Sequence, residues 1–144
     1  MANFAVREFH PYDIDGMGMT LVQGQIGSGD GLTQYAMQLK ASGQSFTATV
    51  DDVPIACIGL IDFWQGRQYA WAFLSDDFCK AKLALTRAVH RWLRYHHAAG
   101  RIETAVQCDN PRAIRWAEGF GFEREGTMRQ WMLGQDFFMY ARVR

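Results

Sequence analysis

The sequence predicts a mixed α/β fold, in which a mainly antiparallel central sheet carries helices on both faces. Apolar residues recur at helical spacing in two separated stretches, 31–40 and 80–97. Between these stretches, over 45–75, and again over 137–143, the apolar period changes to two, which is typical of strands. The length of 144 residues fits one domain with its own core, so we expect a single domain over residues 1–144.

The first quarter of the chain is predicted to hold one strand and two helices. The strand covers 3–9 and ends at a His-Pro pair. A first helix is expected within 12–24, with Asp13 or Asp15 as its N-cap. A second is expected over about 31–40, where apolar residues recur at helical spacing.

The segment between these two helices, GQIGSGDG at 24–31, is rich in glycine. It lacks the Gly-Lys-Ser/Thr ending of a nucleotide-binding loop and follows no predicted strand. We therefore interpret it as a flexible connector.

Three consecutive strands are predicted in the middle of the chain. SFTATVDD and VPIACIGLIDFW, at 45–52 and 53–64, form a β-hairpin around the paired aspartates between them. YAWAFLS, at 69–75, is the third strand and follows a Gln-Gly turn.

The clearest helical pattern covers 80–97, and Gly100 is expected to end that helix. A strand follows over 101–108. Asn110 and Pro111 then begin another helix as N-cap and first helical residue. The side chains predicted to share the buried face of the 80–97 helix are Leu85, Ala88, Val89, Trp92 and His96.

The tail is predicted to close the sheet as a hairpin. The turn is placed at Gly134-Gln135, which returns the chain onto TMRQWML. One face of the last strand is expected to carry Phe137, Met139, Ala141 and Val143.

Composition narrows the class of protein. The formal net charge is zero, so any attraction to nucleic acid or to a membrane would have to be local. The three cysteines lie far apart, which favours reduced thiols over a disulfide framework. The start has no apolar signal-peptide region, and no apolar run is long enough to span a membrane. We expect a soluble, cytoplasmic protein.

The order of elements, together with the stretch 108–126, resembles the GNAT superfamily of acetyl-CoA-dependent N-acetyltransferases. The likeness is greatest to the branch that acetylates protein N-termini. The resemblance implies acetyl-CoA as cofactor and an amine on a protein or small molecule as acceptor. For Asn110 alone, helix capping is favoured over ligand contact. The residues that carry the likeness are Asn110, Gly121, Phe122, Glu125, Gly126 and Arg129.

GNAT enzymes hold the coenzyme A pyrophosphate on backbone N–H groups of a glycine-containing loop at a helix N-terminus. The matching stretch here, SDDFCKAK at 75–82, contains no glycine. Asp76 and Asp77 place carboxylates where the pyrophosphate would arrive and already suit the helix dipole. Lys80 could supply a counter-charge, but its spacing from Asp76 also fits an ordinary helical ion pair. We therefore expect a degraded acetyl-CoA loop.

If coenzyme A does bind, the resemblance implies which residues would contact it. They lie at the end of the third predicted central strand, in the helix that follows, and at the start of the last helix. These cofactor candidates are Phe73, Ser75, Lys80, Lys82 and Asn110.

Acetyl transfer also needs a carboxylate that removes a proton from the acceptor ammonium. The strand that often supplies it in the family, 69–74 here, contains none. Asp62 and Glu103 on neighbouring strands are the nearest candidates, and both are expected to be solvent-facing strand ends. The tyrosine that many members use as general acid falls at Ala117, although the N-terminal-acetylating branch also tends to lack it.

A narrower resemblance concerns AWAFLSDD, the helix after it, and the pattern N-x-x-x-R-W-x-x-x-x-G-F. These are similar to the small GNAT-like internal virion proteins of T7-like phages, which also lack a well-formed glycine loop. The resemblance implies a phage or prophage origin and a place in the host cytoplasm or the virion. It also implies a role in assembly or binding, with a protein partner or a second copy.

The segment 78–102 holds six Lys/Arg and no acid. Arg87, Arg91 and Arg94 share a helical face that could meet nucleic acid or an acidic protein surface. A solvated helix face is the favoured interpretation, because the net charge is zero. No metal site is expected at His96-His97, since no cysteine or carboxylate lies at ligand spacing.

Three functional hypotheses follow. The leading one is a GNAT-fold protein with a degraded acyl-CoA site that serves as a phage-type structural, assembly or binding component. The second is an active, divergent N-acetyltransferase, in which Lys80, Lys82 and Asn110 handle acetyl-CoA and Asp62 or Glu103 is the base. The weakest is a nucleic-acid-binding module.

Overall fold

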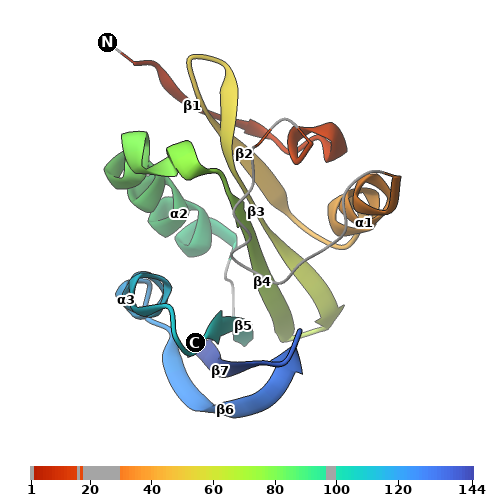
Figure 1. The fold of residues 1–144 in the computed structure, drawn as a ribbon, viewed down its shortest axis with the longest axis vertical. Helices are drawn as coiled ribbons and strands as arrows, with labels where there is room; N and C mark the ends of the chain where they lie inside the picture. Colours follow the sequence, from red (N-terminus) through yellow and green to blue (C-terminus); the bar gives the residue numbers. More distant parts are fainter. Residues whose placement is uncertain (1, 16, 18–29, 97–99) are drawn as a thin grey trace.

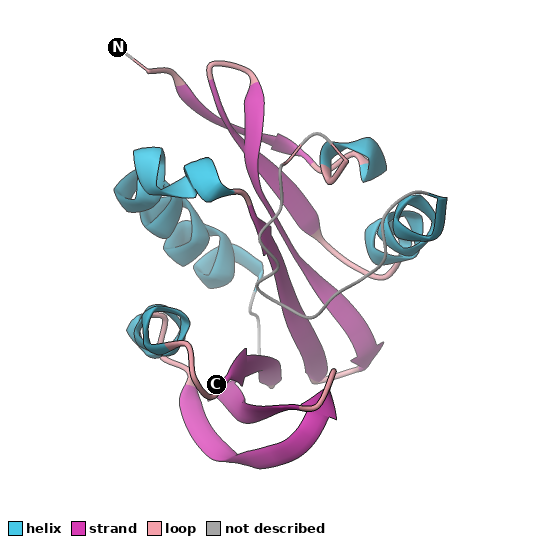
Figure 2. Ribbon diagram, in the orientation of Figure 1, coloured by secondary structure: helices cyan, strands magenta, loops and turns pink. Residues whose placement is uncertain are grey.

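The computed structural model describes residues 2–15, 17, 30–96 and 100–144. Within these residues, one seven-stranded sheet runs through the centre of the molecule, and α-helices lie on both of its faces (Figure 1). Helix α1 lies on one side, while α2 and α3 lie on the other (Figure 2). The predicted mixed α/β architecture is confirmed.

The elements follow the predicted order from β2 onward. The strands are β1 (Phe4–Glu8), β2 (Ser45–Val50), β3 (Val53–Trp64), β4 (Arg67–Leu74), β5 (Arg101–Gln107), β6 (Glu123–Met132) and β7 (Gln135–Val143). The α-helices are α1 (Asp30–Ala41), α2 (Lys82–His96) and α3 (Pro111–Gly119), and the short 3₁₀ helices are η1 (Pro11–Asp13) and η2 (Asp76–Ala81).

The strands are arranged in the order β1-β2-β3-β4-β5-β7-β6. Every neighbouring pair is antiparallel except β4 and β5, which are parallel because α2 intervenes between them in the chain. The sheet is therefore mainly antiparallel, with its one parallel pairing at the centre.

An apolar cluster lies on each face of the sheet. The larger one joins the sheet to α2 and α3 and includes the fully buried Leu85 and Ile102. The smaller one lies on the α1 side and includes Phe9, Trp71 and Phe73. Alternation along β4 explains the division, since Ala70, Ala72 and Leu74 meet the first cluster.

Local signals account for the ends of the elements. Asp51 and Asp52 both have positive φ, at 49° and 67°, as a two-residue hairpin turn between twisted strands requires. At the end of α3, Gly121 has φ 88° and its N–H bonds the Glu118 carbonyl at 3.0 Å, while the Phe122 N–H reaches Ala117 at 3.3 Å. This is a Schellman ending, which glycine accommodates without strain.

The first helix was predicted within 12–24, and most of that range, residues 16 and 18–24, lies outside the described residues. The described part contains the end of η1 and a turn, and the N-cap of η1 is His10, so Asp13 is not the cap. Asp13 instead closes the capping box by accepting a hydrogen bond from the His10 N–H at 2.8 Å. Residues 16 and 18–29, with most of the predicted connector, lie outside the described residues.

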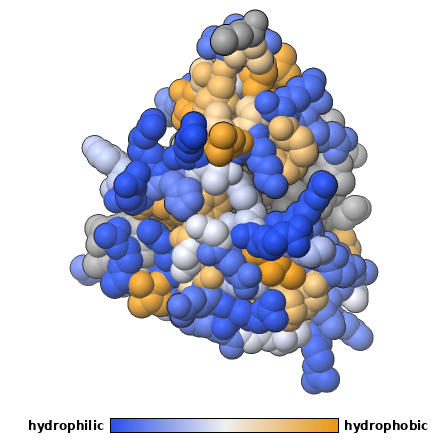
Figure 3. Space-filling model, turned by 90° about the vertical axis from the view of Figure 1, so that its left-hand side faces the viewer, coloured by the Kyte–Doolittle hydropathy of each residue, from blue (hydrophilic) through white to orange (hydrophobic). Residues whose placement is uncertain are grey.

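The face covered by α2 and α3 is largely hydrophilic, and apolar surface gathers at the end of the molecule where the chain begins (Figure 3). Among the described residues, no helix combines the length and apolarity that crossing a membrane requires.

Candidate functional site

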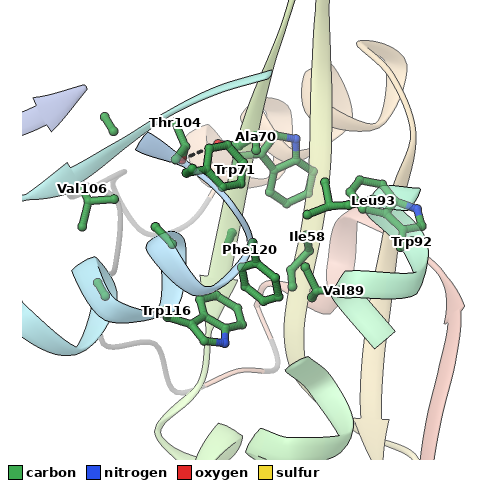
Figure 4. Close-up of a pocket in the computed structure, with 15 residues that line it drawn as sticks. Ile58, Ala70, Trp71, Val89, Trp92, Leu93, Thr104, Val106, Trp116 and Phe120 are labelled. Atoms are coloured by element: carbon green, nitrogen blue, oxygen red, sulfur yellow. Dashed lines mark hydrogen bonds between the residues drawn. The ribbon is translucent and has the colours of Figure 1, made fainter. Parts of the chain in front are cut away.

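The central strands β4 and β5 lie side by side at one end and then separate. Their parallel pairing covers only Arg67–Tyr69 and Arg101–Glu103. Just beyond, the Thr104 hydroxyl donates a hydrogen bond to the Ala70 carbonyl at 3.0 Å. Beyond this point β4 stays paired with β3 and β5 stays paired with β7, but β4 and β5 no longer pair with each other. Side chains from α2 and α3 line the space between them (Figure 4).

Apolar side chains fill most of that space. What remains is a central cavity of about 90 Å³, room for about three water molecules at ~30 Å³ each. Figure 4 shows the ring of Phe120, the C-cap residue of α3, directed toward Ile58 of β3 and Val89 of α2. The Thr104 hydroxyl, the polar group contributed by β5, is already used in the bond to Ala70.

A hydrogen bond ties α3 to α2 beside this cavity. The Trp116 indole N–H donates to the Thr86 hydroxyl at 3.1 Å. That hydroxyl in turn donates to the Lys82 carbonyl at 2.7 Å. The His90 ring of α2 meets the ring of Phe120, the C-cap residue of α3, edge to face with centroids 4.6 Å apart, so α3 is held against α2 by both a polar and an aromatic contact.

A groove of about 340 Å³ opens where η2, α2 and α3 begin, and we call it the α2–α3 groove. Three of the predicted cofactor residues line it together: Ser75, Lys82 and Asn110. Arg112, which the sequence analysis did not single out, adds a second cation. The other lining residues are Leu74, Asp76, Phe78, Cys79, Ala113 and Trp116.

The other two predicted cofactor residues lie elsewhere. The Phe73 side chain packs with Phe9 and Trp71 in the cluster on the opposite face of the sheet. Lys80 lines a different groove, and its ammonium lies 3.4 Å from the Asp77 carboxylate, one residue closer in sequence than the expected partner Asp76.

The start of η2 already uses its own donors and acceptors. The buried Ser75 hydroxyl accepts a hydrogen bond from the Asp77 N–H at 3.1 Å, and the Ser75 carbonyl accepts one from the Phe78 N–H at 3.1 Å. The cap is therefore Ser75, while Asp76 and Asp77 are exposed in the first turn. The regular α-helix begins at Lys82, two residues later than predicted.

Asn110 acts as the predicted helix cap. Its side-chain oxygen accepts a hydrogen bond from the Ala113 N–H at 3.1 Å, and Pro111 is the first helical residue. The capping interpretation is confirmed. A contact between Asn110 and a ligand stays a prediction.

Glu103 corrects the expectation of a solvent-facing strand end. It is buried, with 4% of its surface exposed. Arg67 donates to its two oxygens at 2.5 and 3.0 Å, and Arg101 donates at 3.0 Å. The hydrogen bonds from Arg67, followed by those from Arg101, lower the pKa of Glu103 in spite of its burial. Such a carboxylate is a weak proton acceptor.

Asp62 is exposed at the end of β3, as predicted, and accepts a hydrogen bond from Gln68 at 2.5 Å. Tyr69 lies beside Glu103 in the β4–β5 pairing, and burial raises its pKa to about 12, so it keeps its proton at neutral pH. Glu103 lines a groove with Arg67 and Tyr69, and Asp62 is not among the lining residues of that groove.

Within the described ranges, no group of three or more His, Cys, Asp or Glu side chains is arranged to hold a metal ion. The three cysteines are free, and burial raises the pKa of Cys57 to about 12.

Solved structures of known proteins share the architecture of this chain. No protein-family model matches the sequence. No curated protein matches it either. Among solved structures, an acetyltransferase of the GNAT family from Streptococcus pneumoniae aligns over 99% of this chain and 100% of its own, with TM-score 0.75 and 12% identity.

Two further solved structures have named acceptors. The ribosomal-protein-S18-alanine N-acetyltransferase from Escherichia coli aligns over 98% of this chain and 94% of its own, with TM-score 0.74 and 15% identity. A spermidine N-acetyltransferase chimera, derived in part from Vibrio cholerae, aligns over 97% and 95%, with TM-score 0.75 and 16% identity. At these identities the likeness establishes a GNAT-like fold for this chain.

Proposed function

We propose that this chain is a GNAT-fold protein with a degraded acetyl-CoA site and that it acts as a non-catalytic binding or assembly component. The observation that carries the proposal is the filled space between β4 and β5. The central cavity of about 90 Å³ is well below the roughly 300–1,000 Å³ of typical small-molecule sites. Trp116, which lines this cavity, is also held by its hydrogen bond to Thr86 at 3.1 Å.

Electrostatics at the α2–α3 groove supports the same conclusion. Asp76 lines the groove, and Asp77 is the next residue in the chain. Two carboxylates therefore lie at the helix start where a coenzyme A diphosphate would have to bind. The N–H groups of Asp77 and Phe78 are already bonded to Ser75. Anions are attracted to a helix N-terminus through such free N–H groups, and here the first of them have partners.

The absence of a suitable base among the predicted candidates is the third support. Glu103 is paired with two arginines and its pKa is lowered, while Asp62 is exposed and lines none of the cavities and grooves described above. Removal of a proton from an acceptor ammonium requires a carboxylate that is free to take it.

The finer form of the proposal is a virion or assembly component of a phage or prophage. It rests on the resemblance of AWAFLSDD and the N-x-x-x-R-W-x-x-x-x-G-F pattern to the internal virion proteins of T7-like phages. In this form the protein acts in the host cytoplasm or in the virion, and its partner is another protein or a second copy. Nucleic acid is the disfavoured partner, because the net charge is zero.

Titration with acetyl-CoA tests the proposal. A ligand at one hundred times its dissociation constant stabilises a protein by about 2.7 kcal/mol, which thermal unfolding detects readily. We expect no shift in Tm and no heat of binding with acetyl-CoA at millimolar concentration. A saturable shift would contradict the proposal. The double variant Asp76→Asn with Asp77→Asn is the informative companion, since it removes the repulsion and leaves the packed cavity unchanged.

An active N-acetyltransferase is the second candidate, because the α2–α3 groove does bring Ser75, Lys82 and Asn110 together and adds Arg112. In this case Lys82 and Arg112 would hold coenzyme A phosphates, and Asp62 or Glu103 would be the base. Release of coenzyme A thiol from acetyl-CoA over a panel of amines and peptide N-termini would reveal it. Loss of that activity in Lys82→Ala and Glu103→Gln, with folding retained, would establish the second candidate in place of the first.

A further inference from the structure

A larger groove lies on the other side of the start of α2, and the function proposed above does not use it. It has a volume of about 700 Å³ and runs between the N-terminal half of α2 and the outer end of β1 and β2. We call it the α2–β1 groove. Its lining residues are Ala2, Phe4, Val50, Cys79, Lys80, Ala81, Lys82, Leu83, Ala84, Thr86 and Arg87.

The floor of this groove is apolar. Phe4 and Val50 pack against the edge of the main core cluster and are only partly buried. Leu83 projects from α2 with 65% of its surface exposed. The start of β1 lies at the end of the molecule (Figure 1) where Figure 3 shows hydrophobic residues gathered. Strand β1 is also an edge strand of the sheet, which adds backbone groups at the margin.

The rim of the groove is cationic. Lys80, Lys82 and Arg87 line it, and no lining residue is acidic. Arg91 and Arg94 are exposed further along α2, at helical spacing from Arg87. All fifteen acidic residues of the chain lie outside 78–102.

The carboxylates that border the groove leave most of this charge uncompensated. Asp77 pairs with Lys80 at 3.4 Å. Asp51, in the β2–β3 turn, accepts a hydrogen bond from the Asn3 N–H at 2.8 Å. Lys82 and Arg87 are exposed.

We propose that the α2–β1 groove binds an acidic amphipathic segment of a partner protein. Apolar side chains of the segment cover Phe4, Val50 and Leu83, and its carboxylates meet Lys82 and Arg87. The inference rests on the proposed function, in which the chain acts by binding, and it names the chemistry of the partner. A phosphate backbone fits less well, because single-stranded nucleic acid needs stacking rings and Phe4 is the one aromatic residue among the lining residues described.

Selection from a random sixteen-residue peptide display library tests the proposal without a known partner. We expect the enriched peptides to combine Asp or Glu with apolar residues at a regular spacing. Their affinity is then measured by fluorescence anisotropy of the labelled peptide on the unmodified protein. Binding near the start of α2 is reported by a solvatochromic label on Cys79 in a Cys108→Ser background. Cys79 is exposed and lines both this groove and the α2–α3 groove, so the matched variants below decide which groove is occupied. Cys57 is buried and does not interfere.

Matched variants separate the groove from general charge attraction. Leu83→Asp and Arg87→Glu should each weaken the selected peptide about tenfold or more, as expected for one apolar and one charged contact of a small interface. Arg94→Glu makes the same charge change two turns further along α2, outside the groove lining, and should alter the affinity less than threefold. Circular dichroism and Tm confirm that each variant is folded.

The proposal is overturned by enrichment of neutral or basic peptides, by no enrichment, or by equal losses in Arg87→Glu and Arg94→Glu. Tighter binding of duplex DNA or of phosphatidylserine vesicles, competing with the peptide, also overturns it. So does a dimer in sedimentation that Arg87→Glu dissociates, since a second copy would then occupy the groove. Acetyl-CoA binding bears only on the proposed function, so the two failures are distinguishable.

Discussion

Asp13 and Glu103 are both buried carboxylates held by arginine, but their surroundings differ. Asp13, 8% exposed, accepts two hydrogen bonds from Arg7 at 2.8 and 2.9 Å, one from the Thr47 hydroxyl at 2.7 Å and one from the His10 N–H at 2.8 Å. It has one cationic partner and two neutral ones. These bonds join β1, η1 and β2 at the edge of the sheet.

Glu103 has two cationic partners, Arg67 and Arg101, and lies in the central strand β5. Arg101 also bonds the exposed Glu125 on β6 through both of its terminal nitrogens. Positive and negative charges thus alternate from the sheet interior to the surface. In the Asp13 cluster, by contrast, Arg7 donates onward to a backbone carbonyl, that of Glu8, at 3.1 Å.

A carboxylate in the central strand of the sheet can have the same structural bonding as one at the sheet edge. The pKa is lowered at both sites. At Asp13 burial alone would raise the pKa, and the hydrogen bonds from Arg7, Thr47 and His10 together outweigh it. At Glu103 the hydrogen bonds from Arg67 are the largest effect and outweigh burial. Asp13 has an evident structural role at the sheet edge. Glu103, for all its central position, is bonded in the same manner, so we interpret it as structural rather than as a base.

Replacing Arg7 with methionine should have the largest effect. Asp13 would keep its charge but lose its one arginine, and breaking a buried pair in this way typically costs about 3–5 kcal/mol. Because the Arg7 side chain is 45% exposed, we expect the lower end, about 3 kcal/mol.

Urea unfolding followed by circular dichroism measures this loss. Arg94→Met is the matched control and should change stability by less than about 0.5 kcal/mol, as surface substitutions do. If both variants unfold at the same urea concentration, the Asp13 cluster does not stabilise the fold.

Replacing Arg67 with methionine should destabilise the protein less than Arg7→Met does, because Arg101 still compensates the Glu103 charge. The double variant Arg67→Met with Glu103→Gln should be more stable than the sum of the single losses predicts, since the unpaired charge is removed with its partner. The same urea assay measures all three proteins. A greater loss of stability in Arg67→Met than in Arg7→Met would contradict the proposed difference between the two clusters.

The fold was predictable from local patterns because each of those patterns is set by neighbouring residues. Asn110-Pro111 starts α3, Gly121 ends it, and alternation identified the hairpin of β2 and β3. Asp13 was predicted as a helix N-cap because an aspartate before a helical pattern fits that role, but it lies inside η1 and closes a capping box whose N-cap is His10.

The surroundings of Glu103 were not predictable in the same way. Its burial depends on the parallel register that places Arg67 beside Arg101, and nothing in the sequence specifies that register. A partial signal existed: Arg101 and Glu103 share one face of a strand at a spacing of two. Phe73 and the buried Trp71 are two residues apart in β4, so they share a face of the strand. That face is the one opposite to α2 and α3.

The pH dependence of stability sharpens the comparison further. Both carboxylates have folded-state pKa values below their ordinary values of 3.8 and 4.5. Their contribution is therefore fully present above those values and is lost as the pH falls below them. Each group can add up to about 1.4 kcal/mol per pH unit to the acid slope.

Urea midpoints between pH 5 and pH 2.5 measure this slope. Asp13→Asn and Glu103→Gln should each flatten it, and the two variants should do so over neighbouring pH ranges. A slope unchanged by Glu103→Gln would mean that Glu103 is not held as a carboxylate, which would return it to the list of possible bases.

Glu125→Gln should have the smallest effect, about 0.5 kcal/mol or less, because exposed ion pairs contribute little. Glu125 lies at the outer end of the charge series, where solvent screens its attraction to Arg101. The loss of stability in Glu125→Gln should become smaller still when the salt concentration rises from about 0.05 to about 0.5 M. The loss of stability in Arg67→Met should not change with salt. A large, salt-independent loss in Glu125→Gln would show that the surface carboxylate fixes Arg101 on Glu103, and the two clusters would then differ in kind rather than in degree.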